Sequence, residues 1–81
     1  MSTEVYKVDE TFLFKIESPE EIQFLKDFLS PSDGDIFSLG QEDLEKAVEE
    51  AKKMKRYLPE DLLRELRKAL KKYGGFSFRI R

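Results

Sequence analysis

The chain has 81 residues, of which 40% are charged, and its net charge is −2. It contains no cysteine and no histidine, which excludes disulfides, thiolate metal sites and catalysis by a histidine base. We therefore expect no catalytic residues, no metal site and no cofactor, and a protein that is not an enzyme.

An aromatic strand is predicted near the N-terminus. Over residues 11–17, apolar side chains alternate with mostly polar ones, so that two phenylalanines and an isoleucine share one face. This two-residue period is typical of a half-buried strand. Residues 5–8 either extend it or form a separate strand. Because Asp9-Glu10 offers neither glycine nor asparagine for a tight turn, the sequence favours one long strand at about 4–17 over a hairpin.

A helix is predicted at about 19–29. Ser18 is placed to cap its first turn, Pro19 suits the first helical position, and Glu21 has the spacing of a capping box. The helix should end there because the next residue, Ser30, precedes a proline and such residues avoid the helical conformation.

The segment 30–35 is predicted to be a loop, since it is rich in serine, proline, aspartate and glycine. Asp33 and Asp35 flank Gly34, an arrangement that suits a hard cation. The further ligands of a calcium loop are missing, however, and these residue types are common turn formers. Residues 35–39 are too few for periodicity to distinguish a third strand from an apolar segment packed on the core.

Two further helices are predicted at about 41–57 and 59–73. Gly40 is placed to cap the first of them, and Pro59 ends it because proline cannot continue a helix. Pro59 also suits the first position of the next helix, whose end is marked by the glycine pair that begins at Gly74.

The C-terminal residues 76–81 alternate between apolar and polar side chains, which predicts a strand. Its aromatic face needs the same helices as the strand at 12–16, so we expect the two to pair. The predicted fold is α+β, in a single small domain of residues 1–81. Its sheet has two or three strands, at about 4–17 and 76–81 with 35–39 as the optional third, and is covered on one face by helices at about 19–29, 41–57 and 59–73.

The net charge hides an uneven distribution. Residues 1–50 carry fourteen acids and four bases, a net charge of −10, whereas residues 51–81 carry eleven bases and three acids, a net charge of +8. Such a split suggests an electropositive face or a charge-complementary contact between copies. The alternative is that the two halves fold against each other and their charges interleave. The high content of Lys, Glu and Arg is also typical of thermophile proteins and of idealised designs.

Basic side chains in the C-terminal third are the strongest functional signal. If they converge, they form a surface for a nucleic acid or an acidic partner, with Tyr57 and Tyr73 near enough in sequence to stack on bases. Against nucleic acid stands the net negative charge, and bases near helix C-termini are expected from the helix dipole alone. The candidate residues are Lys52, Lys53, Lys55, Arg56, Arg64, Arg67, Lys68, Lys71, Lys72, Arg79 and Arg81.

A sheet of two or three strands leaves unpaired edges and a second face without cover. Leu13 on that face, with Tyr6 or Val8, is apolar enough to favour a partner, and a homodimer would cover it and enlarge a thin core. The alternative is that charged residues on the same face, such as Lys15 and Arg79, keep it solvated and the chain monomeric.

These observations predict a small non-enzymatic interaction or structural protein that acts through contacts with a protein partner or with a second copy of itself. The alternative is a nucleic-acid-binding accessory protein that uses the basic C-terminal third. No small-molecule substrate is evident. No stretch approaches the roughly 18 apolar residues of a membrane helix, and the N-terminus lacks the pattern of a signal peptide. We therefore expect a cytoplasmic protein without a membrane partner.

Overall fold

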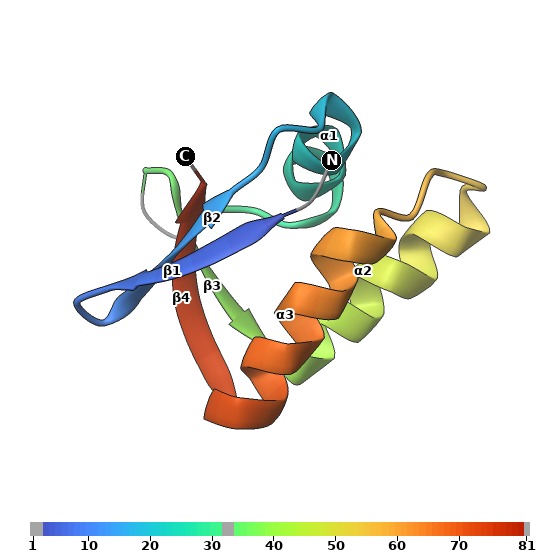
Figure 1. The fold of residues 1–81 in the computed structure, drawn as a ribbon. Coiled ribbons are helices and arrows are strands. Elements are labelled where there is room, and N and C mark those ends of the chain that lie inside the picture. The colour runs from blue at the N-terminus through green and yellow to red at the C-terminus, as the bar shows by residue number, and fades with distance from the viewer. Residues whose placement is uncertain (1–2, 32–33, 81) are drawn as a thin grey trace.

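The computed structural model describes residues 3–31 and 34–80. These residues form an α+β fold in which a mixed four-stranded sheet lies against three helices (Figure 1). The predicted fold class is confirmed, and the sheet has more strands than the two or three predicted. In chain order the elements are β1 (Glu4–Val8), β2 (Thr11–Lys15), α1 (Pro19–Phe28), β3 (Ile36–Gly40), α2 (Gln41–Lys53), α3 (Glu60–Tyr73) and β4 (Gly75–Ile80).

The last strand in the chain lies inside the sheet. The strand order is β1-β2-β4-β3, so β4 pairs with β2 on one side and with β3 on the other. The β2–β4 pair is parallel and places Phe12 beside Phe78, whereas the other two pairs are antiparallel. The predicted pairing of the strand at 12–16 with the strand at 76–81 is therefore confirmed, and aromatic residues from both ends of the chain meet in the middle of the sheet.

The predicted single strand at 4–17 is wrong. The structure has a hairpin in which Val8 pairs with Thr11, so that only Asp9 and Glu10 form the loop. Asp9 has a φ of 57°, the left-handed conformation that tight hairpin turns use. Aspartate is one of the residues other than glycine that adopt this conformation at small cost. To require glycine or asparagine before predicting a tight hairpin turn is therefore too strict at this position.

The apolar segment predicted at 35–39 is strand β3, at the edge of the sheet and shifted by one residue to Ile36–Gly40. Phe37 points into the core, where its ring stacks on that of Phe78 with the centroids 5.2 Å apart. Helix α2 follows at once. The backbone N–H of Gly40 donates to Asp43 Oδ2 at 2.8 Å, and Gly40 is the N-cap of α2, as predicted.

Helix α2 ends at Lys53, earlier than the predicted residue 57. Its end is a Schellman motif, in which the N–H of Arg56 donates to the carbonyl of Ala51 and the N–H of Lys55 to that of Lys52. Lys55 has a φ of 54° at the position where glycine is usual. The sequence therefore carries no ordinary stop signal at the place where the helix stops.

Replacing Lys55 by glycine is expected to raise the free energy of unfolding by about 0.5–1 kcal/mol, because glycine adopts a positive φ without the steric cost of a Cβ atom. Urea denaturation measures the change. Lys55→Ala is the matched control, since it removes the same charge and keeps the strained backbone, and it should give no gain. Equal effects of the two substitutions would show that charge, and not backbone conformation, is responsible.

Helix α3 begins at Glu60, and Pro59 is its N-cap instead of its first residue as predicted. The early end of α2 also leaves Met54 57% exposed. The Gly74 that follows α3 has a φ of 78°, and its N–H donates to the carbonyl of Leu70. Glycine adopts this left-handed conformation easily, and it ends the helix where the sequence predicts.

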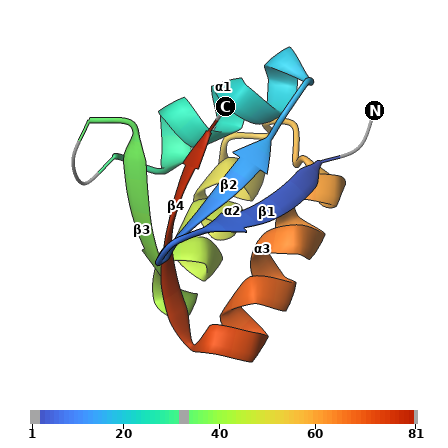
Figure 2. The same ribbon diagram turned by 60° about the vertical axis from the view of Figure 1, so that its left-hand side comes forward.

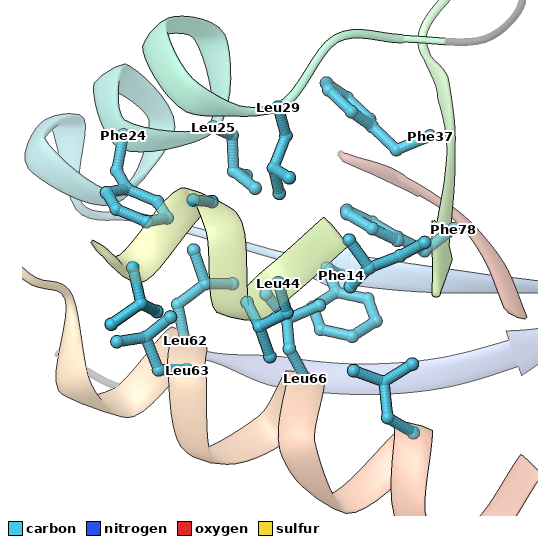
Figure 3. Close-up of a cluster of buried hydrophobic side chains, with 14 of the residues drawn as sticks. Phe14, Phe24, Leu25, Leu29, Phe37, Leu44, Leu62, Leu63, Leu66 and Phe78 are labelled. Carbon is cyan, nitrogen blue, oxygen red and sulfur yellow. The ribbon is translucent and has the colours of Figure 1, made fainter. Parts of the chain in front are cut away.

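The core lies between the sheet and the helices, which all cover the same face (Figure 2). Phe14 on β2 and Phe78 on β4 are fully buried, with their ring centroids 4.8 Å apart. Leu25, Leu44 and Leu66, one from each helix, are also fully buried and belong to the same cluster (Figure 3). Every layer of the fold thus contributes to one continuous apolar cluster.

Helix α1 is held at its start by side-chain hydrogen bonds. Ser18 Oγ accepts from the backbone N–H of Glu21 at 3.4 Å, which confirms the predicted cap. The Glu21 side chain was expected to return to the backbone at the cap. It is instead 5% exposed and accepts a hydrogen bond of 2.8 Å from the hydroxyl of Thr3. A residue ahead of β1 therefore anchors the first turn of α1.

Candidate functional site

Five of the predicted basic residues line one groove. It lies between α2 and α3, which run side by side in opposite directions (Figures 1 and 2), and its volume is about 590 Å³. Four of the bases are on α3 at intervals that place them on one helix face, and the fifth is on α2. The five residues are Lys52, Arg64, Arg67, Lys68 and Lys71. We call this the basic groove.

The floor of the basic groove is apolar. Val48 of α2 and Leu63 of α3 are buried, and the half-buried Leu58 comes from the link between the helices. Glu60 is the single acid among the described lining residues, so this lining has a formal charge of +4. A cationic rim around an apolar floor suits a ligand that carries both anionic and apolar groups.

Three of the five bases already contact acids of the same chain. The contacts are Arg64–Asp61 at 2.6 Å, Lys68–Glu65 at 3.6 Å and Arg67–Glu45 at 4.0 Å. No described carboxylate lies within 4.0 Å of the ammonium group of Lys52 or Lys71. Ion pairs at a solvated surface contribute at most about 1 kcal/mol, so the acids of a partner can replace them at small cost.

The remaining predicted bases do not line this groove. Lys53 and Lys55 are exposed at the end of α2, and Lys72 is exposed in the last turn of α3, with its Nζ 5.4 Å from the ring centroid of Tyr73. Arg79 lies on β4, and Arg81 lies outside the described residues. The predicted basic surface is thus divided, and only part of it converges.

Arg56 turns away from the groove toward α1. Its guanidinium pairs with the carboxylate of Asp27 and lies over the ring of Phe28, 5.6 Å from the centroid. Hydrogen bonds from the Gln23 amide and from Arg56 hold the pKa of Asp27 below its usual value. Arg56 therefore joins the α2–α3 link to α1 and has a structural partner.

Neither tyrosine predicted to stack on bases lines the basic groove. Tyr73 packs against Phe12, with the ring centroids 4.9 Å apart. Tyr57 is 58% exposed in the link between α2 and α3, where it lines other hollows. The described lining of the groove contains no aromatic ring and so offers no platform on which nucleic acid bases stack.

An acidic hollow adjoins the basic groove. It has a volume of about 550 Å³ and lies between the start of α1 and the start of α3. Leu58 and Glu60 line both the hollow and the groove, so that two surfaces of opposite charge are neighbours. The Ser18 hydroxyl donates to Glu20 at 2.8 Å, which lowers the pKa of Glu20 and favours its charged form. The acids of the hollow are Glu20, Glu21, Glu60 and Asp61.

The residues predicted for self-association lie together on the face of the sheet that the helices leave open. Tyr6 on β1 lies opposite Leu13 on β2, which in turn lies opposite Arg79 on β4. Tyr6 is 49% exposed and Val8 is 53% exposed. The structure thus places these side chains on one surface, and self-association through that surface stays a prediction.

Asp33, which was considered as a cation ligand, lies outside the described residues. Among the residues that the structure does describe, no group of three or more acidic side chains could hold a metal ion. None of the described helices is both long and apolar enough to cross a membrane.

The apolar floor of the groove and its neighbour, the acidic hollow, were not predicted. Val48 and Leu63 belong to the apolar stripes of their helices, and a base follows each of them one turn later, Lys52 and Arg67 respectively. A base one turn from the edge of an apolar stripe is the signal that marks the rim of such a groove. The hollow gives no local signal, because its acids come from segments far apart in the sequence.

Comparison of the chain with models of protein families, with curated proteins and with solved structures finds no match, so that its function has to be inferred from its own residues.

Proposed function

We propose that this protein is a non-catalytic binding module whose basic groove docks an acidic and partly apolar surface of a protein. The observation that carries the proposal is the presence of five bases and an apolar floor in one groove. Carboxylates of the partner would pair with the rim, while its apolar side chains would cover the half-buried Leu58, which lies beside the buried Val48 and Leu63. Specific protein interfaces combine such an apolar centre with a charged periphery.

A nucleic acid fits this groove less well than an acidic protein does. Phosphate groups would use the bases of the rim and leave the apolar floor without a partner. The described lining provides no ring for base stacking, and the net charge of −2 repels a polyanion at long range. An acidic protein segment satisfies both the rim and the floor.

The spacing of the bases favours a helical ligand. Arg64, Lys68 and Lys71 follow one another at intervals of four and three residues on α3, which corresponds to a rise of about 10 Å over two turns. An amphipathic helix laid along the groove presents carboxylates at the same intervals. A helical peptide with acids every three to four residues beside an apolar stripe is therefore a suitable probe of the groove.

Fluorescence anisotropy with a labelled amphipathic peptide, in which glutamates and leucines recur at three- and four-residue intervals, tests the proposal. The wild-type protein should bind it at low salt and lose affinity as salt screens the charges. Arg67→Glu/Lys71→Glu should weaken binding by about 10–100-fold, because two attractive contacts become repulsive.

The matched control is Lys53→Glu/Lys55→Glu, which changes the net charge by the same amount outside the groove lining and should retain most of the affinity. Equal losses in the two double variants, or no binding at low salt, would contradict docking in the groove. Displacement of the peptide by a single-stranded oligonucleotide at a lower concentration than by unlabelled peptide would favour the nucleic-acid alternative instead.

A further inference from the structure

We infer that the acidic surface that fits the basic groove belongs to a second copy of this chain. This inference rests on the proposed function of the groove and names its partner. The acidic side chains that line the hollow of one copy lie against the basic rim of the groove in the other, and a twofold axis repeats the contact. The uneven distribution of charge along the sequence suggests a charge-complementary contact between copies. This pairing places that contact at the starts of α1 and α3 and along the α2–α3 pair.

Twofold pairing requires a surface that is complementary to itself, so that each patch contacts the other patch of the second copy. The acidic hollow and the basic groove meet this condition because they adjoin at Leu58 and Glu60. An axis that passes beside these two residues lays each hollow on a groove of opposite charge. Two such surfaces on distant parts of the molecule would join copies head to tail, into a ring or an open chain, instead of a closed pair.

At the junction between the two surfaces, Glu60 lies beside apolar side chains. Tyr57, which is 58% exposed, lines the acidic hollow together with Leu58, and the groove continues the apolar surface with Val48 and Leu63. Burial of an exposed tyrosine removes a large apolar area from water and leaves its hydroxyl free to find a polar partner. The pair therefore has an apolar centre inside a rim of opposite charges, which is the usual arrangement of specific contacts.

The charges on the two surfaces are opposite in sign. The described lining of the groove carries a formal +4, in which Glu60 is already counted. On the other side Glu20 and Glu60 supply carboxylates, while Glu21 is bound by Thr3 and Asp61 by Arg64. The net charge of the whole chain is only −2, so long-range repulsion between two copies is small. Whether two copies associate then depends on the local attraction between the two surfaces.

Sedimentation velocity with charge-reversal variants tests this pairing. Arg67→Glu/Lys71→Glu cancels the formal charge of +4 on the groove lining, and Glu20→Lys/Glu60→Lys cancels the formal charge of −4 on the hollow. Each variant alone should be monomeric at concentrations where the wild type is a dimer. An equimolar mixture of the two should form heterodimers, because one contact then keeps the unchanged acids of the first variant opposite the unchanged bases of the second, while the other places the new acids of the first opposite the new bases of the second.

Val8→Glu is the control on the open face of the sheet, since Val8 is 53% exposed and its replacement leaves the core intact. The dimer should survive this change. Loss of the dimer in this variant, a wild type that stays monomeric at about 100 µM in low salt, or a mixture that stays monomeric although both variants keep the wild-type circular dichroism would overturn the inference.

A neutral variant covers the case in which a reversed chain does not fold. Glu20→Gln/Glu60→Gln keeps the shape of both side chains and should weaken the dimer by about 10-fold or more; unchanged dimerisation would overturn the pairing.

The peptide experiment, run at nanomolar protein where the wild type is monomeric, separates the two proposals. A wild type that binds the peptide and never dimerises overturns the self-pairing alone, whereas failure of both overturns the proposed function as well.

Discussion

Replacement of Phe78 by alanine is expected to lower the free energy of unfolding by about 3–5 kcal/mol. Phe78 is fully buried on the central strand β4 and contacts three other rings, those of Phe14, Phe37 and Phe76, at centroid distances of 4.8, 5.2 and 5.6 Å. The substitution removes the ring and leaves a cavity that strands on both sides cannot close. A chain of this length has a total stability of roughly 4–12 kcal/mol, so the loss is a large fraction of the total.

Guanidinium denaturation followed by circular dichroism measures this loss. Met54→Ala is the matched control, because it also removes a large apolar side chain, but one that is 57% exposed. It should change the free energy of unfolding by less than about 0.5 kcal/mol. Comparable losses in the two variants would mean that the centre of the sheet is not the core of the fold.

Replacement of Thr3 by valine should lower the free energy of unfolding by about 1–3 kcal/mol. Valine has the shape of threonine but cannot donate the hydrogen bond of 2.8 Å that the hydroxyl gives to Glu21. Glu21 is 5% exposed, so water cannot readily take the place of the missing donor. The cost is therefore mainly that of a buried carboxyl group left without its partner, not that of the lost contact itself.

A double-mutant cycle distinguishes this explanation from a simple loss of packing. Thr3→Val/Glu21→Leu removes both polar groups, and its stability should return to within about 1 kcal/mol of the wild type, because an apolar pair has no unsatisfied group. Thr3→Ser keeps the donor and should cost less than Thr3→Val. If the double variant is less stable than Thr3→Val alone, the buried hydrogen bond is not the source of the effect.

The parts of the fold that were predicted correctly are those determined by residues close together in the sequence. Hydrophobic period and flanking residues fix the three helices and the pairing of aromatic strands, and Ser18 and Gly40 cap their helices as expected. The errors lie where an unusual residue adopts a left-handed backbone. Asp9 makes the hairpin turn and Lys55 ends α2, and neither residue type is a reliable signal, because tertiary packing supplies the energy that the local sequence does not.

For the candidate site, the sequence predicts the types of residue involved but not how they are arranged in space. The sequence identifies bases on α2 and α3 but does not show that Lys52 and Lys71 face one groove while Arg56 turns to Asp27. That division depends on the place where α2 stops and on how the two helices pack, which are properties of the folded chain. The acidic hollow was missed for the same reason, since Glu20 and Glu60 meet only after α1 and α3 are packed.

The central position of β4 bears on how the protein is made in the cell. The ribosome delivers residues 75–80 after all the other strands, yet β2 and β3 both need this strand as their shared neighbour. Until it emerges, the nascent chain holds only a hairpin and a separate strand, with the rings of Phe14 and Phe37 lacking their partner Phe78. The sheet therefore assembles late through a contact between distant segments, which is slow, and until then the unpaired strands and their exposed rings favour aggregation.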